Sequence, residues 1–531
     1  MTEVTTKLFI SEGKGILGIE LGSTRIKAVL IGDNQQPIAD GSYLWENNLI
    51  DGNWTYNLDD VWKGIQSCYK NLYDNVYQRY GVKLSKLAGL GISAMMHGYL
   101  VFDRSDNLLT PFRTWRNNNT LEASERLMSL LEHPIPQRWS IAHLYQSLLE
   151  NQEHVSDIDY MTTLSGYVHR KLTGRKILGI GDASGMFPID VDKAKFDSEM
   201  MRRFNDIVKD EALPWNIEQI MPEVLVAGQD AGSLTEVGAL LLDPTGQLKH
   251  NCPMCPPEGD AGTGMIATNT IAMRTGNISA GTSIFAMVVL DKKLKKVHPE
   301  LDLVTTPDGK LVAMAHSNNC SSNLDSWMKL FEEVASSLGT NVSADELYDT
   351  LFRESLKGDD DCGGLMVYGY LSGEHMTHFK KGCPLFLNPS DSKFTLANFM
   401  RANLLSALGA MKIGIDILVE EEGVKLNKIL AHGGLFKTKG VVQQLMATAL
   451  NVPVATVENA SDGGAWGIAL LASFLIDEEK NLESFLTNKV FLCNDEFIID
   501  IDKDEFEGVQ EFMKRYKDCL PVEREAVNCL T

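Results

Sequence analysis

The sequence has 531 residues, of which 44% are hydrophobic and 23% are charged, and its formal net charge is −22. This length predicts two large domains, and the composition is typical of a folded, soluble protein. The negative charge and the lack of a long Lys/Arg run argue against nucleic acid and anionic membrane surfaces as partners.

The cysteines and the first residues bear on location. Nine cysteines, odd in number and mostly scattered, indicate a reduced, cytosolic protein. The first fifteen residues contain neither a basic nor an apolar segment of a secretion signal. Residues 463–476 form a near-apolar stretch that is too short and glycine-rich to span a bilayer. We therefore expect a cytoplasmic protein without membrane contact, and a homodimer stays an open alternative.

The order of predicted elements indicates an α/β fold. A predicted hairpin with glycine at its tip opens the chain. The same order of strand, glycine tip and strand occurs again from residue 276. Other predicted elements are a strand at 38–45, a helix at 61–76, a buried strand at 87–95, helices within 121–175, a strand at 428–431, a helix at 440–450, a strand at 452–457 and a buried helix at 465–476. The restart places the main domain boundary near residue 265.

Two hairpin tips suit phosphate binding. Gly22-Ser23-Thr24 ends one β-favouring run, and Gly281-Thr282-Ser283 ends another. Glycine lets a backbone approach an anion, while N–H groups and hydroxyls donate hydrogen bonds. Either tip alone is also compatible with an ordinary tight turn. Their recurrence favours a two-lobed, ATP-using enzyme, although neither a Walker A sequence nor a protein-kinase HRD set occurs.

Five separated motifs resemble those of the FGGY family of carbohydrate kinases, in the family's order and closest to the pentulose kinases (xylulokinase and ribulokinase). They are GIELGSTRIKAVL, SAMMHGYLVFD, PFRTWRNNN, PPEGDAGTGMIA and AHGGLFKTKGVVQQL. The resemblance runs from about residue 15 to residue 472. It implies two duplicated actin-like (ribonuclease H-like) ATPase domains with an interdomain cleft. The expected ranges are 1–265, 266–480 and an acidic C-terminal extension at 481–531.

The first motif resembles the family's phosphate loop. Gly22, Ser23 and Thr24 would contact ATP phosphates, and Lys27 stands where a basic residue often follows. Glu20 replaces the family's Asp and is expected to hold Mg²⁺ through water. The alternative for Glu20 is an exposed carboxylate at a strand end.

The next two motifs resemble sugar-contacting segments. Met96 and His97 fall on the Met-His-Gly motif of pentulose kinases, although a lone His after an apolar strand is usually structural. Trp115, Arg116 and Asn117 would offer an apolar wall with donors and acceptors for hydroxyl groups. For Arg116 a surface salt bridge is the alternative.

Asp260 in PPEGDAGTG matches the family's general base, and a metal contact is also assigned to it. A carboxylate within hydrogen-bond reach of the sugar hydroxyl orients that hydroxyl and accepts its proton. The alternative is a helix N-cap, which is compatible with the catalytic role. Asp182 in GDASG could be mistaken for the base, and we interpret it as structural or peripheral.

The last motif resembles the family's adenine site. Gly433 and Gly434 would let the adenosine lie against the backbone, and Thr438 and Gln443 fall on the expected polar positions. Gln443 as a plain helix-surface residue is an equal alternative.

The resemblance implies an ATP- and Mg²⁺-dependent kinase acting on the terminal hydroxyl of a small-molecule sugar. Met96-His97-Gly98 suggests D-xylulose, Asp260-Ala261 suggests L-ribulose, and the former is slightly favoured. Glycerol, L-fuculose and L-rhamnulose are other acceptors to consider. The rivals from other classes are an actin-like or chaperone-type ATPase without an acceptor and a sugar-binding relative without catalysis.

Overall fold

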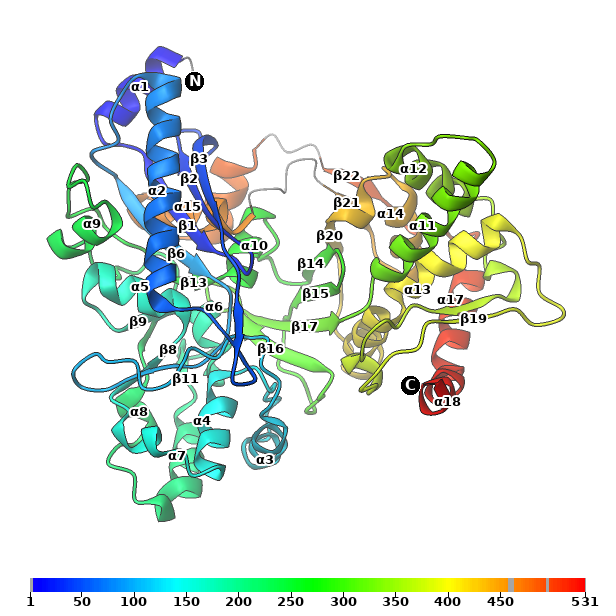
Figure 1. Cartoon of the computed structure of the whole chain (residues 1–531), viewed down its shortest axis with the longest axis horizontal. Helices are drawn as coiled ribbons and strands as arrows, with labels where there is room; N and C mark the ends of the chain where they lie inside the picture. The colour runs from blue at the N-terminus through cyan, green and yellow to red at the C-terminus, as the bar shows by residue number, and fades with distance from the viewer. Residues whose placement is uncertain (1–2, 457–462, 493–495, 531) are drawn as a thin grey trace. The chain divides into compact units, whose positions relative to one another are not determined.

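A computed structural model of the chain describes residues 3–456, 463–492 and 496–530, which divide into two compact units (Figure 1). Unit 1 comprises Met1–Ile271, Leu303–Val312 and Asn459–Cys493. Unit 2 comprises Ala272–Asp302, Ala313–Glu458 and Asn494–Thr531. The units divide the chain differently from the predicted ranges 1–265, 266–480 and 481–531. The difference arises because a late helix, α15 (Gly463–Ile476), packs on the sheet of unit 1.

Unit 1 is built on a five-stranded sheet with the order β13-β6-β1-β2-β3. Its strands are β1 (Ile16–Leu21), β2 (Arg25–Ile31), β3 (Pro37–Leu44), β6 (Gly89–Ala94) and β13 (Glu258–Gly259). Strands β1, β2 and β3 pair antiparallel, whereas β6 runs parallel to β1 and β13 runs parallel to β6. The carboxyl ends of β1, β6 and β13 therefore lie at the same edge.

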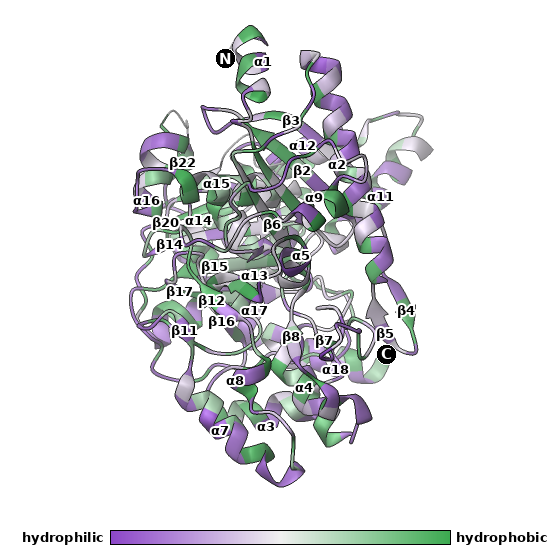
Figure 2. Ribbon diagram, turned by 90° about the vertical axis from the view of Figure 1, so that its left-hand side faces the viewer, coloured by the Kyte–Doolittle hydropathy of each residue, from purple (hydrophilic) through white to green (hydrophobic). Residues whose placement is uncertain are grey.

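Helices cover both faces of this sheet. A Cβ placed on Gly41 would lie 2.5 Å from Leu72 N of α2 (Leu58–Tyr80), and one on Gly18 would lie 2.1 Å from Ala465 O of α15. Gly41 pairs with Ala28, and Gly18 pairs with the next residue, Val29, so the two glycines face opposite sides. Figure 2 shows hydrophobic residues along β2 and β3 and hydrophilic residues along α2. The sheet is thus the centre of a three-layer core.

The remaining elements of unit 1 surround this core. They are α1 (Glu3–Ser11), β4 (Asn48–Ile50), β5 (Asn53–Thr55), β7 (Leu100–Phe102), α3 (Leu121–Leu131), α4 (Ser140–Leu149), η1 (Glu153–Asp157), β8 (Tyr160–Thr162), α5 (Leu164–Thr173), β9 (Ile177–Gly179), α6 (Ile180–Ala183), β10 (Ile189–Asp190), β11 (Lys195–Phe196), α7 (Ser198–Val208), η2 (Lys209–Glu211), α8 (Ile217–Ile220), β12 (Glu223–Leu225), α9 (Glu236–Leu242), α10 (Asp260–Ala267), α16 (Leu482–Phe485) and η8 (Leu486–Val490).

The second large sheet repeats the central pattern of the first. Its order is β16-β17-β15-β14-β20-β21-β22. The hairpin of β14 (Thr275–Ala280) and β15 (Ile284–Val289) is antiparallel, β20 (Lys428–His432) runs parallel to β14, and β21 (Val454–Thr456) runs parallel to β20. The order β15-β14-β20-β21 corresponds to β2-β1-β6-β13 of unit 1. This repetition confirms the predicted α/β fold of two duplicated domains.

The other elements of this half follow in chain order. They are β16 (Leu301–Thr305), β17 (Leu311–Ser317), α11 (Ser322–Ser337), α12 (Ala344–Ser355), η3 (Cys362–Gly364), β18 (Met366–Tyr368), η4 (His375–Thr377), β19 (Leu385–Leu387), α13 (Leu396–Asp416), η5 (Ile417–Glu421), η6 (Gly434–Phe436), α14 (Val441–Leu450), β22 (Phe497–Ile499), α17 (Phe506–Asp518) and α18 (Leu520–Leu530).

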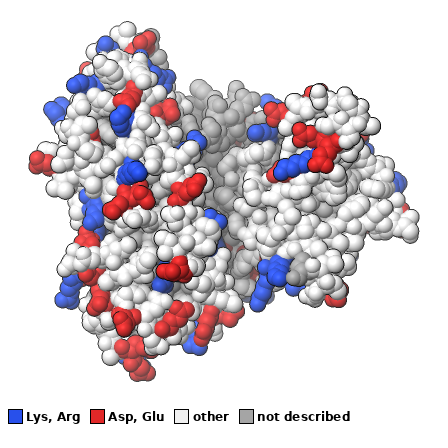
Figure 3. Space-filling model, in the orientation of Figure 1, with Lys and Arg blue, Asp and Glu red and all other residues white. Residues whose placement is uncertain are grey.

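One helical stretch, Leu396–Glu421, is long and apolar enough to span a membrane by length and composition. It is longer than the apolar stretch at 463–476 to which the sequence drew attention. Its most apolar window is 83% buried in the fold, as in the core helix of a globular domain. On the face drawn in Figure 3, acidic side chains are spread widely and basic ones lie among them.

Candidate active site

The edge formed by the carboxyl ends of β1, β6 and β13 brings three predicted motifs of unit 1 together. Leu21 pairs with Ala94, and Ala94 pairs with Gly259. The Gly22 tip, the Met96 segment and Asp260 follow directly after these strands. Ligands of open α/β sheets bind at this edge.

The Gly22-Ser23-Thr24 tip is held by aromatic donors. Indole Nε1 of Trp45 donates to Gly22 O at 2.7 Å, and the hydroxyl of Tyr56 donates to Ser23 O at 2.6 Å. Gly22 N closes the turn by donating to Arg25 O at 3.0 Å. With its carbonyls bonded in this way, the tip has a fixed conformation, and Thr24 is exposed.

Glu20 and Lys27 lie opposite each other in the β1–β2 register, so both side chains are on one face of the hairpin. Glu20 is half-buried, and a Cβ placed on Gly464 would lie 2.2 Å from its Oε1. The Glu20 carboxylate therefore packs against the start of α15 and is not the exposed strand-end group of the alternative interpretation. Within residues 3–456, 463–492 and 496–530, no group of three or more His, Cys, Asp and Glu side chains could hold a metal ion.

His97 is buried and has a left-handed backbone with φ of 67°. Its Nδ1 lies 3.1 Å from Gly185 O. Because a carbonyl can only accept, Nδ1 carries the proton, and Nε2 is the acceptor nitrogen of the neutral ring. Burial, together with nearby Arg138, lowers the pKa of His97 to about 3. His97 is therefore neutral at physiological pH and suited to accept a hydrogen bond from a hydroxyl group.

Asp260 is the first residue of α10. Gly259 is the N-cap of this helix, so Asp260 is not the N-cap of the alternative interpretation. Oδ1 of Asp260 accepts hydrogen bonds from Met96 N at 3.2 Å and Ala261 N at 3.0 Å. Burial raises the pKa of Asp260, while these amide donors lower it. The structure thus joins the predicted base to the predicted sugar segment.

The three residues of the Trp-Arg-Asn segment have different environments. Trp115 is 37% exposed, and its Nε1 donates to Ser23 Oγ at 3.2 Å. The Arg116 guanidinium lies 4.0 Å from the centroid of the Trp54 ring, a cation–π contact, and its Nη1 donates to Asn47 Oδ1 at 3.2 Å. It forms no salt bridge, the alternative interpretation, with any residue that the structure describes. The Asn117 amide is buried and pairs with the Trp54 backbone in both directions, at 2.8 and 2.9 Å. Trp115 therefore lies at the Gly22-Ser23-Thr24 tip. Asn117 fixes the segment that carries Trp115 by hydrogen bonds to the Trp54 backbone.

Unit 2 contains a pocket of about 610 Å³ at the equivalent strand ends. Gly281, Gly434 and Thr438 line it, so the structure brings residues of two predicted nucleotide motifs together. Ser279 pairs with His432 in the parallel β14–β20 ladder, which places the Gly281 tip beside the Gly433 corner. Gly433 has φ of 111°, and a Cβ there would lie 2.1 Å from Ala280 O.

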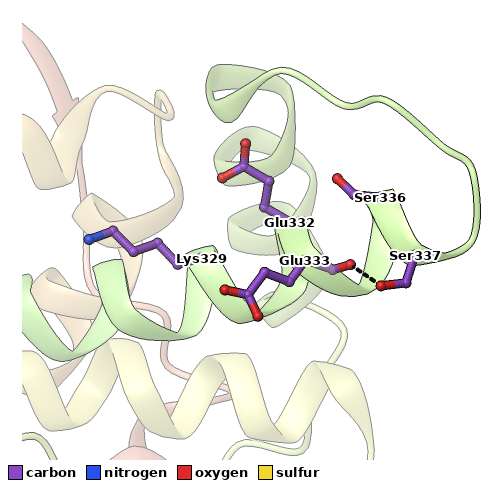
Figure 4. A pocket seen from close by; sticks show the side chains of 5 residues that line it. All are labelled: Lys329, Glu332, Glu333, Ser336 and Ser337. Atoms are coloured by element: carbon purple, nitrogen blue, oxygen red, sulfur yellow. Dashed lines mark hydrogen bonds between the residues drawn. The ribbon is translucent and has the colours of Figure 1, made fainter.

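The sequence did not indicate the acidic wall of this pocket. Asp325 of α11 and Asp345 and Asp349 of α12 line it, and the hydroxyl of Tyr348 donates to Asp325 Oδ1 at 2.6 Å. Nothing in two ordinary amphipathic helices singles these residues out. Figure 4 shows another hollow, along α11 itself, lined by Lys329, Glu332, Glu333, Ser336 and Ser337. All five come from one helix, and the hollow contains none of the predicted site residues.

Two other predicted nucleotide residues, Thr282 and Gln443, are not among the residues that line the pocket of about 610 Å³. The Thr282 carbonyl accepts from Cys320 N at 3.0 Å, which fixes the tip. Gln443 is 1% exposed and does not line the pocket. Its Nε2 donates to Val454 O and Phe497 O, both at 2.7 Å. The Gln443 amide thus joins β21 to β22, and the alternative of a helix-surface residue is wrong.

Two buried carboxyl groups lie beside Asp260. The sequence predicted no catalytic role for Asp182 and did not indicate Glu258. Asp182, interpreted as structural or peripheral, is fully buried, and its Oδ1 has no hydrogen-bond partner among the residues that the structure describes. Its Oδ2 accepts from the hydroxyls of Thr163 and Ser165. Burial raises the pKa of Asp182 to about 7 and that of Glu258 to about 8. Glu258 stands two residues before Asp260, and this proximity was the one signal in the sequence.

Comparisons with known proteins cover most of the chain. Residues 15–242 match the N-terminal domain, and residues 276–476 the C-terminal domain, of the FGGY family of carbohydrate kinases. A xylulose kinase of Haemophilus influenzae is 23% identical over 465 residues, 85% of this chain and 89% of that protein.

Two solved structures share the fold. A ligand-bound xylulose kinase from Lactobacillus acidophilus has a TM-score of 0.79 at 17% identity, covering 98% of this chain and all of the other. The glycerol kinase of Plasmodium falciparum with ADP has a TM-score of 0.74 at 15% identity, covering 95% of this chain and 98% of the other.

Proposed function

The chain belongs to the FGGY family of carbohydrate kinases, and from this premise we propose that it uses Mg²⁺ and ATP to phosphorylate the terminal hydroxyl of a ketopentose. The products are a pentulose 5-phosphate and ADP. D-xylulose is favoured slightly over L-ribulose, because Met96-His97-Gly98 resembles the pentulose kinase motif and the relative described above is named a xylulose kinase. A cytoplasmic location suits this use of ATP.

The observation that carries the proposal is the hydrogen bond from Met96 N to Asp260 Oδ1, at 3.2 Å. It supports the proposal that the Met96-His97 segment and the base Asp260 belong to one binding site for the sugar. In this site His97 Nε2 accepts a hydrogen bond from a sugar hydroxyl, and Asp260 accepts the proton of the attacking hydroxyl. The sugar oxygen forms the new bond to the γ-phosphorus as the bond to the β–γ bridging oxygen breaks, and ADP leaves.

We place the nucleoside of ATP in the pocket of unit 2. Its volume of about 610 Å³ lies within the range of small-molecule sites. The backbone at Gly281 and Gly434 gives an open floor, while Asp325, Asp345 and Asp349 supply acceptors for ribose hydroxyls or an exocyclic amine. Gln443 has no place in this proposal because its amide is used inside the fold.

The residues near the Gly22 tip fit magnesium as part of an ATP complex. Mg²⁺ usually takes one or two carboxylates, with water and substrate phosphates as its other ligands. Glu20, two residues before Gly22, would supply the carboxylate through water. Asp260 would be a second acceptor at the same edge of the sheet, after β13, which β6 separates from β1. Charge on the phosphates would be neutralised by the metal.

The test measures ADP release with Mg²⁺ and ATP against D-xylulose, L-ribulose, D-ribulose, L-xylulose, L-fuculose, L-rhamnulose and glycerol. We expect one ketopentose to stimulate release strongly and phosphorus NMR to locate the phosphate on its terminal carbon. Asp260→Asn retains an acceptor for Met96 N but not the base, so we expect kcat to fall about 10²- to 10⁴-fold. Asp157→Asn, at an exposed position of η1, is the matched control.

The alternative is an actin-like ATPase whose turnover needs no acceptor. In that case ADP release would be equal with and without every sugar in the panel. Either this outcome or full activity of Asp260→Asn would contradict the proposal.

A further inference from the structure

The side chain of Glu258 occupies a niche beside two glycines. The niche exists because these glycines have no side chains that would fill it. The Glu258 side chain is buried, with 1% exposed, and the two oxygens of its carboxyl group accept from Gly181 N at 3.3 Å and Asp182 N at 3.0 Å. A Cβ placed on Gly179 would lie 2.3 Å from Oε1, and one on Gly181 would lie 2.3 Å from Oε2. Any side chain at these two positions would displace the carboxyl group of Glu258, so its position depends on both glycines.

The turn that donates these hydrogen bonds to Glu258 also contacts the His97 ring. This turn, residues 181–185, closes with the bond from Gly185 N to Asp182 O at 3.0 Å. Gly185 O accepts from His97 Nδ1 at 3.1 Å. A Cβ placed on Gly185 would lie 2.6 Å from His97 Nδ1 and 3.1 Å from the terminal methyl carbon of Met96.

The other side of the niche leads to Asp260. Glu258 and Gly259 form β13, and α10 begins with Asp260. A Cβ placed on Gly259 would lie 2.2 Å from Cγ of Met96, and Met96 N donates to Asp260. The contacts therefore form a closed ring that runs from Glu258 through the 181–185 turn, His97 and Met96 to Asp260, and back to Glu258 through the backbone.

We propose that Glu258 is a positioning residue, which fixes the 181–185 turn against β13 and so holds His97 and Asp260 in register for the acceptor. The role of the two held residues rests on the proposed function. Glu258 itself has no need to touch the substrate. A misplacement of about 1 Å can cost about a hundredfold in rate, which makes such a brace consequential.

Glu258→Gln tests the brace with little change of volume. A glutamine would turn its NH₂ group toward one of the two amide donors, so one of the hydrogen bonds is lost. We expect kcat/KM for the sugar to fall about tenfold to a hundredfold, with the KM for ATP within about twofold. We also expect more ADP released per sugar phosphate formed, because water competes with a poorly aligned hydroxyl. A loss of folded protein would lower kcat alone and leave the acceptor KM and this ratio unchanged.

Hydrogen exchange tests the brace without catalysis. In Glu258→Gln we expect faster exchange in the peptide that contains Gly181 and Asp182 and also in the peptide that contains Gly98. Unchanged exchange in both would overturn the inference, whatever the activity. Absence of sugar-dependent turnover in the unsubstituted protein would instead contradict the proposed function. Sugar-dependent turnover with a normal acceptor KM and coupling ratio in Glu258→Gln would overturn the positioning role alone.

Discussion

The indole Nε1–H of Trp115 donates a hydrogen bond to the hydroxyl of Ser23, 3.2 Å away. One residue belongs to the proposed phosphate loop and the other to the segment expected to contact the sugar. Trp115 is 37% exposed, so its ring can contact a ligand while its N–H is bonded to the tip. A change at either residue is therefore transmitted to the other.

Trp115→Phe removes this bond and keeps an aromatic ring. The loss of a hydrogen bond is worth about 1 kcal/mol, so we expect kcat/KM for the sugar to fall about fivefold. The same loss should occur in Ser23→Ala, and the double variant should cost less than the sum of both. Trp215→Phe, which removes an indole bond to Val155 O in unit 1, is the control. Strict additivity in steady-state kinetics would show that the bond does not couple the two residues.

Glu20 is expected to set the magnesium requirement. Glu20→Gln has nearly the same volume but no charge, so we expect the Mg²⁺ concentration for half-maximal rate to rise about tenfold. Glu20→Asp retains the carboxylate and should stay near the unsubstituted value. Magnesium titrations at saturating ATP and sugar measure this effect, with Glu153→Gln of η1 as the control. A magnesium curve for Glu20→Gln that overlays the unsubstituted curve would remove Glu20 from the metal site.

The adjacent glycines Gly433 and Gly434 provide a matched pair. Gly433→Ala would need a left-handed backbone and would push its methyl against Ala280 O, whereas a Cβ on Gly434 has no neighbour within 4 Å in the described part of the chain. We expect Gly433→Ala to lower the free energy of unfolding by about 1–3 kcal/mol and Gly434→Ala to change it little. Urea unfolding measures both. Similar unfolding midpoints for the two variants would contradict the strain at Gly433.

The raised pKa of Asp182, about 7, makes the stability of the protein depend on pH. Between the ordinary carboxyl pKa near 4 and pH 7, the folded state keeps a proton that the unfolded state releases. The free energy of unfolding therefore falls as pH rises through this window. Asp182→Asn cannot ionise, and its amide oxygen can still accept from Thr163 and Ser165.

We expect the melting temperature of Asp182→Asn, relative to that of the unsubstituted protein, to rise from pH 5 to pH 8. Groups that titrate equally in both proteins cancel in this difference. Glu258 does not cancel, because its pKa is raised by burial and also by Asp182, so the difference reports Asp182 together with this neighbour. Calorimetric melts at several pH values measure it. A constant difference across this range would mean that Asp182 has an ordinary pKa in the folded protein.

The sequence was sufficient for features carried by short contiguous patterns. The hairpin at Gly22 and its repeat at Gly281 follow from β-favouring runs that meet at glycine, and both occur. The presence of a second lobe could also be predicted, because the same succession of strand, glycine tip and strand restarts in the second half.

Roles that depend on distant partners could not be predicted. Gln443 lies on the expected motif position, yet its amide is used by Val454 and Phe497, which come from two later strands. The amide of Asn117 is used in the same way by Trp54. The role proposed for Glu258 depends on Gly179 and Gly181, which lie about eighty residues earlier in the chain. Because these glycines have no side chains, they leave room for the Glu258 carboxyl group. No local pattern reports such a cavity.

The packing of α15 on β1 has a consequence for synthesis of the protein. Trp466 of α15 donates to Gln35 O at 2.8 Å, joining residues 431 positions apart. At the usual rate of translation, several hundred residues take on the order of tens of seconds to emerge. During this interval the apolar face of β1 and β6 lacks its covering helix, while the strands of the second sheet are already leaving the ribosome. Unit 1 therefore completes its fold only after most of unit 2 has been made, and a ribosome that stalls before residue 463 would release a chain with an uncovered core.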